Sequence, residues 1–320
     1  MTSGSDLKPK QPLVVIVGPT AVGKTEFSIR LALKTNGEIV TADSMQVYRG
    51  LDIASAKPTI KERRGVAHHL IDIVDPDEAF NVAEYRTLAH QAIASVHSRG
   101  RLPILSGGTG LYVKAVLDEF LFPDEGADPI LRRELEQEAE LLGPDALHDR
   151  LRAVDPAAAA RIHPNDVRRV VRALEVHART GVPFSEHLKS KTAPAPPYET
   201  LMFGLTRPRE ELYRRIDERV DEQIRMGLVG EIKEVLAKYG EPKIARQALG
   251  FKEIASYLKG ERTLEEAVEI LKRDTRRFAK RQYTWFRRED RIKWIDLDEI
   301  GSIERAVDLV EVDIRAAFYV

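Results

Sequence analysis

The stretch LVVIVGPTAVGKT, Leu13 to Thr25, decides the fold. It opens with five apolar residues, mostly β-branched, which predict a strand buried on both faces. The spacing G-x-x-x-x-G-K-T then predicts a loop whose backbone N–H groups converge at a helix N-terminus, where the helix dipole favours negative charge. Lys24 adds a mobile positive charge, and the Thr25 hydroxyl can reach a magnesium ion. The loop therefore indicates a pyrophosphate cradle, without saying which pyrophosphate compound it holds.

Length and composition set the broad class. The chain has 320 residues, 43% of them hydrophobic, which suits one large domain with an insertion, or two domains. It has no cysteine, so disulfides and thiolate metal sites are excluded. No N-terminal apolar run follows a basic start, and no apolar run approaches the roughly 18 residues of a membrane helix. We expect a cytoplasmic protein that does not bind a membrane.

The formal net charge of −1 hides an uneven distribution of charge. Residues 273–293 hold nine Lys or Arg against three Asp or Glu. Tyr283, Trp285 and Phe286 are interleaved with these cations, a pattern that suits base stacking and phosphate contact with nucleic acid. The same rings also suit a hydrophobic core. The pattern leaves both interpretations open.

Further apolar segments alternate with helical patterns and predict an open α/β sheet. The predicted strands after the first are residues 38–41, 68–74, 103–106 and 201–205. Ligands of such sheets bind beyond the carboxyl ends of the strands, which places Asp43 and the residues after it near the phosphate loop. Asp43 at this position also suits a simple turn cap.

A second junction of strand, glycines and helix follows at residues 107–110, Gly-Gly-Thr-Gly. It indicates that another backbone approaches the ligand closely, with the Thr109 hydroxyl available to it. The alternative is a tight turn that needs small residues. After the predicted strand at 201–205, the helix that follows Pro208 puts Arg215 and Arg219 on one face. The alternative is a surface ladder in which they pair with neighbouring Glu and Asp.

Between Asp128 and about His187 the apolar residues recur at helical spacing, with Asp-Pro pairs as helix starts and Gly143 and Gly181 as stops. The pattern predicts a small helical insertion. The domain boundaries are then 1–120 for the first part of the core, 121–198 for the insertion, and 199–320 for the second part with a helical C-terminal region. Arg168, Arg169 and Arg172 begin one insertion helix and suit either a solvated face or an anionic polymer.

The position of Asp43 favours group transfer over hydrolysis. The strand at 103–106 ends without the aspartate that hydrolytic phosphate-loop proteins use to hold magnesium, although Asp72 and Asp75 weaken this argument. Asp43 follows the second strand, where a carboxylate can take a proton from an acceptor. The basic segments indicate a large anionic acceptor. A phosphate-loop kinase of a small hydroxyl substrate and a nucleotide-gated RNA-binding adaptor remain as alternatives.

An ordered set of motifs over about residues 13–294 resembles the tRNA dimethylallyltransferases of bacterial type. The motifs are GPTAVGKT, ADSMQVYRGLDIASAKP, GGTGLY, RIHPNDVRRVVRALEV, ALGFKE and KRQYTWFRR. The resemblance implies a P-loop NTPase-like α/β core, a parallel sheet flanked by helices, with a small all-helical insertion domain. It implies transfer of a dimethylallyl group from dimethylallyl diphosphate to N6 of adenosine 37, in tRNAs that read codons beginning with U. The implied cofactor is Mg²⁺, and the implied partner of a monomeric enzyme is the tRNA anticodon stem-loop; whether the loop also binds ATP stays open.

The resemblance also assigns roles to residues. Asp43 matches the general base, Lys24 and Thr109 match catalytic positions at the leaving group, and Thr25 is directed toward the metal. The implied diphosphate-binding or nucleotide-binding residues are Gly18, Pro19, Thr20, Ala21, Val22, Gly23, Lys24, Thr25, Arg215 and Arg219. The implied tRNA-binding residues are Asp43, Ser44, Met45, Gln46, Thr109, Arg132, Arg168, Arg169, Val170, Val171, Arg172, Gln247, Ala248, Leu249, Gly250, Phe251 and Lys252. Arg168 and Val171 stand where some members have glutamine and serine, which leaves sequence-specific readout there open.

Overall fold

A computed structural model describes residues 10–118, 128–187, 198–242 and 248–318. The chain divides into two compact units. The first comprises Met1–Leu117 and Pro197–Val320, and the second is the continuous segment Asp118–Pro196. Each unit has its own hydrophobic core, described in turn below.

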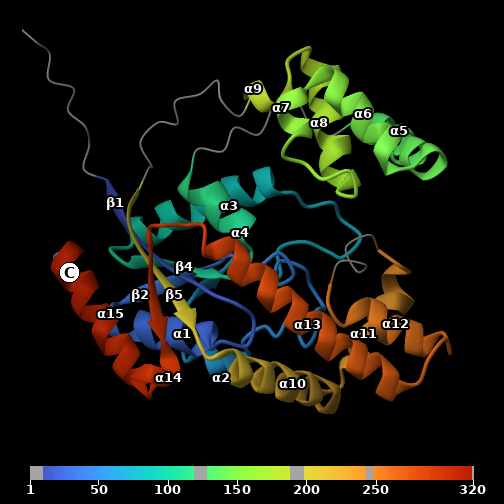
Figure 1. The fold of residues 1–320 in the computed structure, drawn as a ribbon. Helices are drawn as coiled ribbons and strands as arrows, with labels where there is room; N and C mark the ends of the chain where they lie inside the picture. Colours follow the sequence, from blue (N-terminus) through green and yellow to red (C-terminus); the bar gives the residue numbers. More distant parts are fainter. Residues whose placement is uncertain (1–9, 119–127, 188–197, 243–247, 319–320) are drawn as a thin grey trace, which may run out of the picture. The chain divides into compact units, whose positions relative to one another are not determined.

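The first unit is built on a parallel sheet of six strands in the described residues, in the order β3-β2-β4-β1-β5-β6 (Figure 1). The strands are β1 Gln11–Val17, β2 Gly37–Thr41, β3 His68–His69, β4 Leu102–Gly107, β5 Tyr198–Thr206 and β6 Ile292–Asp296. The predicted α/β fold class is confirmed. Because every pairing is parallel, the carboxyl ends of all strands lie at one edge of the sheet.

Helices cover both faces of this sheet (Figure 1). The helices that the structure describes in the first unit are α1 Lys24–Lys34, α2 Ile60–Arg63, α3 Val82–Ser98, α4 Gly110–Leu117, α10 Arg209–Met226, α11 Leu228–Tyr239, α12 Phe251–Leu258, α13 Leu264–Phe286, α14 Leu297–Ile300 and α15 Ile303–Phe318. Val15 and Val17 of β1 pack in the cluster that holds α3 and α4, whereas Val14 and Ile16 pack in the cluster that holds α1 and α15. Burial on both faces explains the unbroken apolar run of β1.

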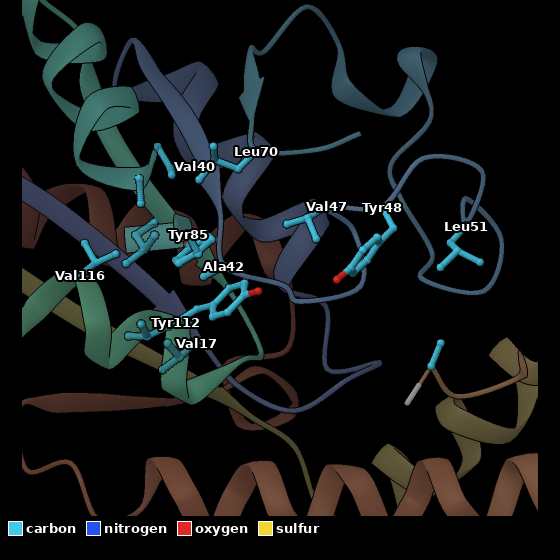
Figure 2. Close-up of a cluster of buried hydrophobic side chains, with 14 of the residues drawn as sticks. Val17, Val40, Ala42, Val47, Tyr48, Leu51, Leu70, Tyr85, Tyr112 and Val116 are labelled. Carbon is cyan, nitrogen blue, oxygen red and sulfur yellow. The ribbon is translucent and has the colours of Figure 1, made fainter. Parts of the chain in front are cut away.

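A pair of stacked tyrosines lies on the α3 and α4 side (Figure 2). The rings of Tyr85 and Tyr112 have centroids 3.8 Å apart and planes inclined by 14°. The buried Tyr85 hydroxyl donates to the Thr41 carbonyl at 3.0 Å, and burial raises the pKa of this phenol well above its usual value. The pair therefore fixes the end of β2, which leads into Asp43, against α3 and α4.

The second unit consists of the helices α5 Pro129–Leu142, α6 Pro144–Val154, α7 Pro156–Ala159, α8 Val167–Thr180 and α9 Phe184–His187. Asp128 and Asp155 accept hydrogen bonds from the first backbone N–H groups of α5 and α7, and Gly143 and Gly181 stand at the ends of α5 and α8. The predicted helix starts and stops in this segment are thus confirmed. Leucine, valine and alanine side chains from α5, α6, α7 and α8 form its core.

Two predictions about strands were wrong. Of the strand expected at residues 68–74, only His68–His69 pairs with the sheet, because Leu70 and Asp72 have φ of 65° and 58°. The backbone after them bonds to the loop that follows β2. Strand β6 was missed, since its sequence lies in the charged run and only Ile292 is buried. In the described residues no helix is long and apolar enough to span a membrane.

Candidate active site

The loop between β1 and α1 presents Lys24 and Thr25 at the carboxyl edge of the sheet. Lys24 begins α1, and its Nζ donates to the Pro19 carbonyl at 2.7 Å. Burial lowers the pKa of Lys24 to about 7, an effect that Asp43 opposes and Arg219 adds to. The lysine is therefore poised to gain a proton when an anion arrives.

Three side chains from distant elements hold this loop in shape. Arg215 of α10 donates from Nε to the Ala21 carbonyl at 3.0 Å, and Arg207 donates to the Val22 carbonyl at 3.0 Å. The Gln282 Oε1 atom accepts from the Thr20 N–H at 2.8 Å. Arg215 was expected near the loop from the resemblance, whereas Arg207 and Gln282 were missed. A signal for Gln282 did exist, because it falls on the apolar stripe of α13, where a polar residue needs a partner.

Burial lowers the pKa of both Lys24 and Arg219, and Asp43, just beyond β2, is close enough for its charge to oppose that lowering. Its Oδ1 atom accepts from the Met45 N–H at 2.9 Å, so Asp43 also caps a turn, as the alternative interpretation held. Its Oδ2 atom accepts no hydrogen bond from any residue that the structure describes. That oxygen is available to a ligand.

Thr109 binds the residue that follows Asp43. Its Oγ1 accepts from the Ser44 N–H at 3.0 Å and donates to the Ser44 hydroxyl at 3.3 Å, while its own N–H donates to the Ala42 carbonyl at 3.1 Å. Gly107 makes this contact possible, since a Cβ there would lie 2.0 Å from the Ala42 oxygen. The second glycine junction therefore holds the segment that carries Asp43.

A single pocket brings Lys24 and Thr25 of the phosphate loop together with Asp43. It is lined by Lys24, Thr25, Ser28, Ile39, Thr41, Asp43, Gln46, Pro58, His68, Ser106 and Gly107. Cation, hydroxyl and carboxylate thus share one hollow at the carboxyl edge of the sheet, where the order of strands places ligands. A phosphorylated ligand in the loop would lie beside the Asp43 carboxylate.

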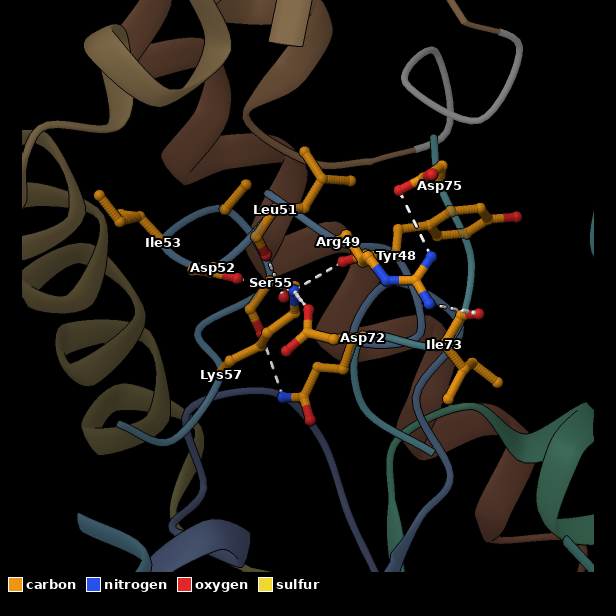
Figure 3. Close-up of polar contacts among 12 residues, drawn as sticks. Tyr48, Arg49, Leu51, Asp52, Ile53, Ser55, Lys57, Asp72, Ile73 and Asp75 are labelled. Atoms are coloured by element: carbon orange, nitrogen blue, oxygen red, sulfur yellow. Dashed lines mark hydrogen bonds and ion pairs between the residues drawn. The ribbon is translucent and has the colours of Figure 1, made fainter. Parts of the chain in front are cut away.

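The loop after Gln46 is fixed by a set of polar contacts (Figure 3). The Lys57 ammonium, only 4% exposed, donates to the Tyr48 carbonyl at 2.6 Å and to the carboxylates of Asp52 and Asp72. Glu231 of α11 accepts from the N–H groups of residues 52–54 at 2.7–2.9 Å. Because Gln46 Nε2 in turn donates to the Ser55 carbonyl, these contacts shape one wall of the pocket. No sequence pattern indicated this role for Glu231.

The basic residues at the start of α8 differ in their surroundings. Arg168 and Arg169 are exposed. Val170 and Val171 are buried in the core of the second unit, so their side chains cannot contact RNA as expected. The reason is that α8 turns this apolar stripe toward α5 and α6.

Arg132 and Arg172, which the resemblance assigned to tRNA binding, bind the carboxylate of Glu175 in the second unit. The fully buried Glu175 accepts from Arg132 at 2.9 Å, from Arg172 at 2.6 Å and from the Asp128 N–H at 2.8 Å. Burial raises the pKa of Glu175, but these hydrogen bonds outweigh it and hold the pKa below its usual value. Arg132 and Arg172 therefore have a structural role in this unit.

The segment at the start of α12 is mostly buried. Lys252 is exposed and pairs with Asp274 at 3.4 Å and Glu253 at 3.3 Å. Leu249 is half-buried, whereas Ala248, Gly250 and Phe251 are buried. Gln247 lies outside the described residues. Among the described residues 248–252, Lys252 alone presents an exposed charged side chain.

The fold and the pocket define a phosphate-loop α/β enzyme whose site pairs an anion cradle with a carboxylate. A family profile described as IPP transferase matches residues 46–289. The chain belongs to this family of prenyltransferases. It is 56% identical to a tRNA dimethylallyltransferase of Desulforudis audaxviator over 91% of this chain and 94% of that one, and 53% identical to one of Symbiobacterium thermophilum over 93% of each.

Solved structures of tRNA prenyltransferases are also similar to this chain. The full-length tRNA isopentenylpyrophosphate transferase of Bacillus halodurans superposes with a TM-score of 0.73 at 47% identity, over 96% of this chain and 97% of that one. A eukaryotic dimethylallyltransferase acting on tRNA superposes with a TM-score of 0.81 at 32% identity, over 96% of this chain and 80% of that one. The expected family is therefore confirmed.

Proposed function

We propose that the chain transfers a dimethylallyl group from dimethylallyl diphosphate to N6 of adenosine 37, in tRNAs that read codons beginning with U. The products are N6-dimethylallyladenosine and diphosphate. The observation that carries the proposal is the single pocket in which Lys24 and Thr25 of the phosphate loop face the same space as Asp43. Family membership supplies the reaction class.

Asp43 acts as the general base in this proposal. The adenine amino group is a weak nucleophile because its lone pair is delocalised into the ring. A carboxylate that takes its proton as the C–N bond forms lowers the barrier. The Oδ2 atom suits this role, while the bond between Oδ1 and the Met45 N–H holds the group in place.

The leaving diphosphate lies in the phosphate loop. Negative charge grows on the bridging oxygen as the C–O bond breaks, and Lys24 neutralises it. In this proposal Thr109 donates a hydrogen bond to that oxygen, its hydroxyl turning from Ser44, to which it donates in the free protein. Arg219 and Arg215 extend the positive charge along α10, and Arg215 also holds the loop.

Magnesium fits the residues of this loop. No group of three or more acidic or histidine side chains that would hold a metal is present in the described residues. Mg²⁺ is typically held by one or two protein oxygens together with substrate phosphates and water, and the exposed Thr25 hydroxyl is such an oxygen. When bound, the ion would neutralise charge on the diphosphate.

The acceptor is the anticodon stem-loop of tRNA, with its adenosine flipped out of the stack toward Asp43. We assign phosphate contacts to the exposed Arg168, Arg169 and Lys252. Gln46, on the wall of the pocket, and Ser44, next to Asp43, contact the flipped nucleotide. The enzyme acts as a monomer in the cytoplasm, where its tRNA substrate is found.

The decisive experiment is transfer to tRNA by the Asp43→Asn variant. The amide oxygen of Asn can still accept from the Met45 N–H, so the turn is kept while the base is lost. We expect tRNA affinity within about twofold of wild type and a transfer rate lowered by about 10²- to 10⁴-fold. The readout is a mass gain of one C5 isoprenoid unit on the anticodon fragment, with dimethylallyl diphosphate and magnesium present.

Two results would contradict the proposal. Undiminished transfer by Asp43→Asn would remove Asp43 from its role. Phosphate transfer from ATP to a small hydroxyl compound, with no prenylated RNA, would instead indicate a kinase.

A further inference from the structure

A turn at residues 52–56 is held from outside by the helices α10 and α11 (Figure 3). The Glu231 carboxylate of α11 accepts from its first three N–H groups. Oε2 accepts from Asp52 at 2.8 Å and from Ile53 at 2.7 Å, and Oε1 accepts from Ala54 at 2.9 Å. A side-chain oxygen that accepts from such N–H groups is the usual cap of a helix start, and here a distant helix supplies it.

The carbonyl groups of the same turn are held as well. Gln223 of α10 donates from Nε2 to the carbonyls of Ile53 at 2.6 Å and Ala54 at 3.3 Å. Ala56 has φ of 47°, a left-handed conformation that is unfavourable for a residue with a side chain. Such a conformation persists where the surroundings enforce it. The turn therefore depends on its contacts with α10 and α11.

The charge of Glu231 acts on this turn. The side chain is half-buried, and within the part of the chain that the structure describes no cation forms an ion pair with it. Burial raises the pKa of Glu231, and the three N–H groups oppose this rise. The neighbouring Asp52 carboxylate pairs with Lys57 at 2.7 Å. A carboxylate removed from water needs such partners to stay charged, and for Glu231 they are the backbone dipoles of the turn.

Both flanks of the turn reach the active-site pocket. Gln46 before it and Pro58 after it line the same hollow as Asp43. Gln46 Nε2 donates to the carbonyls of Ser55 at 3.2 Å and Ala56 at 3.4 Å, and the Gln46 N–H donates to Asp43 Oδ1 at 3.4 Å. A displacement of the turn is thus transmitted through Gln46 to the carboxylate of Asp43.

We infer that Glu231 is a positioning residue of the reaction. By holding the turn it fixes Gln46, and through Gln46 it fixes Asp43, in the arrangement that meets the acceptor base. Glu231 is not among the residues that line the pocket. Other side chains hold the phosphate loop, so the donor side of the site does not depend on this turn. The inference rests on the proposed function for the identity of the acceptor.

Steady-state kinetics of Glu231→Gln with stem-loop RNA test this role. The amide keeps the length of the side chain but offers one oxygen where the carboxylate has two. We expect kcat to fall about 10- to 100-fold, the scale for a misplacement of about 1 Å at the reacting groups. The KM values for RNA and for dimethylallyl diphosphate should stay within about twofold, because the contacts that bind both substrates remain. Hydrogen exchange of the amides of residues 52–54 should become faster.

Two comparisons separate positioning from a general loss of structure. Glu234→Gln, at an exposed position of the same helix, should leave kcat unchanged. In a Gln46→Leu background, Glu231→Gln should lower kcat by a much smaller factor than in the wild-type chain, because the connection to Asp43 is already broken. Equal factors in both backgrounds would overturn the inference. So would a loss of kcat matched by an equal loss in the stoichiometry of donor binding, measured by calorimetry.

A second variant carries the same test if Glu231→Gln does not fold. Glu231→Asp keeps the charge on a side chain one methylene shorter, which reaches fewer of the three N–H groups. It should lower kcat less than Glu231→Gln, again with both KM values kept. Wild-type kcat in this variant, together with faster exchange of the amides of residues 52–54, would overturn the positioning role.

Failure of this inference is distinct from failure of the proposed function. A wild-type chain that prenylates RNA, with Glu231→Gln at wild-type kcat, would overturn the positioning role alone. A wild-type chain that transfers no prenyl group to RNA would contradict the proposed function. In that case, unchanged exchange of the amides of residues 52–54 in Glu231→Gln would separately overturn the hold of Glu231 on the turn.

Discussion

The side-chain amide of Gln282 donates from Nε2 to the carbonyl oxygen of Gly108 at 2.9 Å. Its Oε1 atom accepts from the Thr20 N–H of the phosphate loop. One buried amide thus joins the loop expected to hold the diphosphate to the junction that carries Thr109. Because Gln282 belongs to α13, this basic helix also sets the spacing between the two glycine-rich loops.

Gln282→Leu should therefore loosen the phosphate loop. The change leaves the Gly108 carbonyl and the Thr20 N–H without their partner, at a cost of about 1–3 kcal/mol for each group that stays buried. We expect a KM for dimethylallyl diphosphate raised about tenfold or more and a lowered kcat. Steady-state kinetics with a stem-loop acceptor measure both.

The matched control for Gln282 is Thr284→Ala, two residues along the same helix. The Thr284 side chain is exposed and, within the described part of the chain, bonds only to the Lys280 carbonyl. It should leave the donor KM unchanged. Equal donor KM values for Gln282→Leu and wild type would show that the amide does not position the loop.

Lys24 should make diphosphate affinity depend on pH. Burial lowers its pKa to about 7 in the free protein, and a bound diphosphate favours the charged form. Binding above pH 7 therefore takes up a proton, and the Kd should weaken by up to about tenfold per pH unit as pH rises from 7. Calorimetry in two buffers of different ionisation enthalpy measures the proton uptake.

Lys24→Arg is the control for this pH dependence. The guanidinium stays charged throughout, so the contribution of residue 24 should vanish while the titration of diphosphate itself remains. Wild-type and Lys24→Arg curves that run parallel between pH 6 and 9 would mean that Lys24 keeps its proton in the free protein.

The sequence predicted the parts of the site that local chemistry dictates. The spacing of Gly18, Gly23 and Lys24 specifies a loop conformation almost by itself, and the glycines at 107–110 signal a close approach of backbones. Contacts between distant segments leave no such pattern. Glu231 and Arg207 look like ordinary surface charges in sequence, and only the packing of α10 and α11 brings them to their loops.

Two other features were missed because charged residues occur in a strand and in a helix core. Strand β6 lies at the edge of the sheet and buries only Ile292, so its sequence lacks the apolar pattern of a strand and looks like part of the basic run. Glu175 resembles one of many helix-surface acids, yet it is fully buried between two arginines. Its place among Ala173, Leu174 and Val176 was the available signal, since a buried charge requires partners.

Glu175→Gln should destabilise the second unit. The variant leaves Arg132 and Arg172 without their anion, and because both arginines are about a third exposed we expect a loss of about 2–3 kcal/mol, below the roughly 3–5 kcal/mol of fully buried pairs. The folded pKa of Glu175 is lowered, so its stabilisation is complete above its unfolded pKa and is lost as pH falls through the folded pKa. Hydrogen exchange of α8 amides measures the change.

The half-exposed pair of Glu138 with Arg150 provides a comparison within the same unit. Glu138→Gln should cost under about 1 kcal/mol, as exposed ion pairs do. If Glu175→Gln costs no more than Glu138→Gln at pH 7, the buried pair does not stabilise α8.

The three arginines at the start of α8 fall into two groups: Arg168 and Arg169 are exposed, and Arg172 binds Glu175. Arg168 is exposed without a described ion pair, and Arg169 makes only a 3.4 Å contact with Asp166. Arg168→Gln with Arg169→Gln should lower tRNA affinity and reduce its salt slope by about 1.4–1.8, with the α8 amides still protected. Arg172→Gln should instead speed exchange of those amides because Glu175 loses a partner. An unchanged salt slope for the double variant, measured by filter binding from 50 to 200 mM salt, would place Arg168 and Arg169 on a solvated face and remove them from the RNA interface.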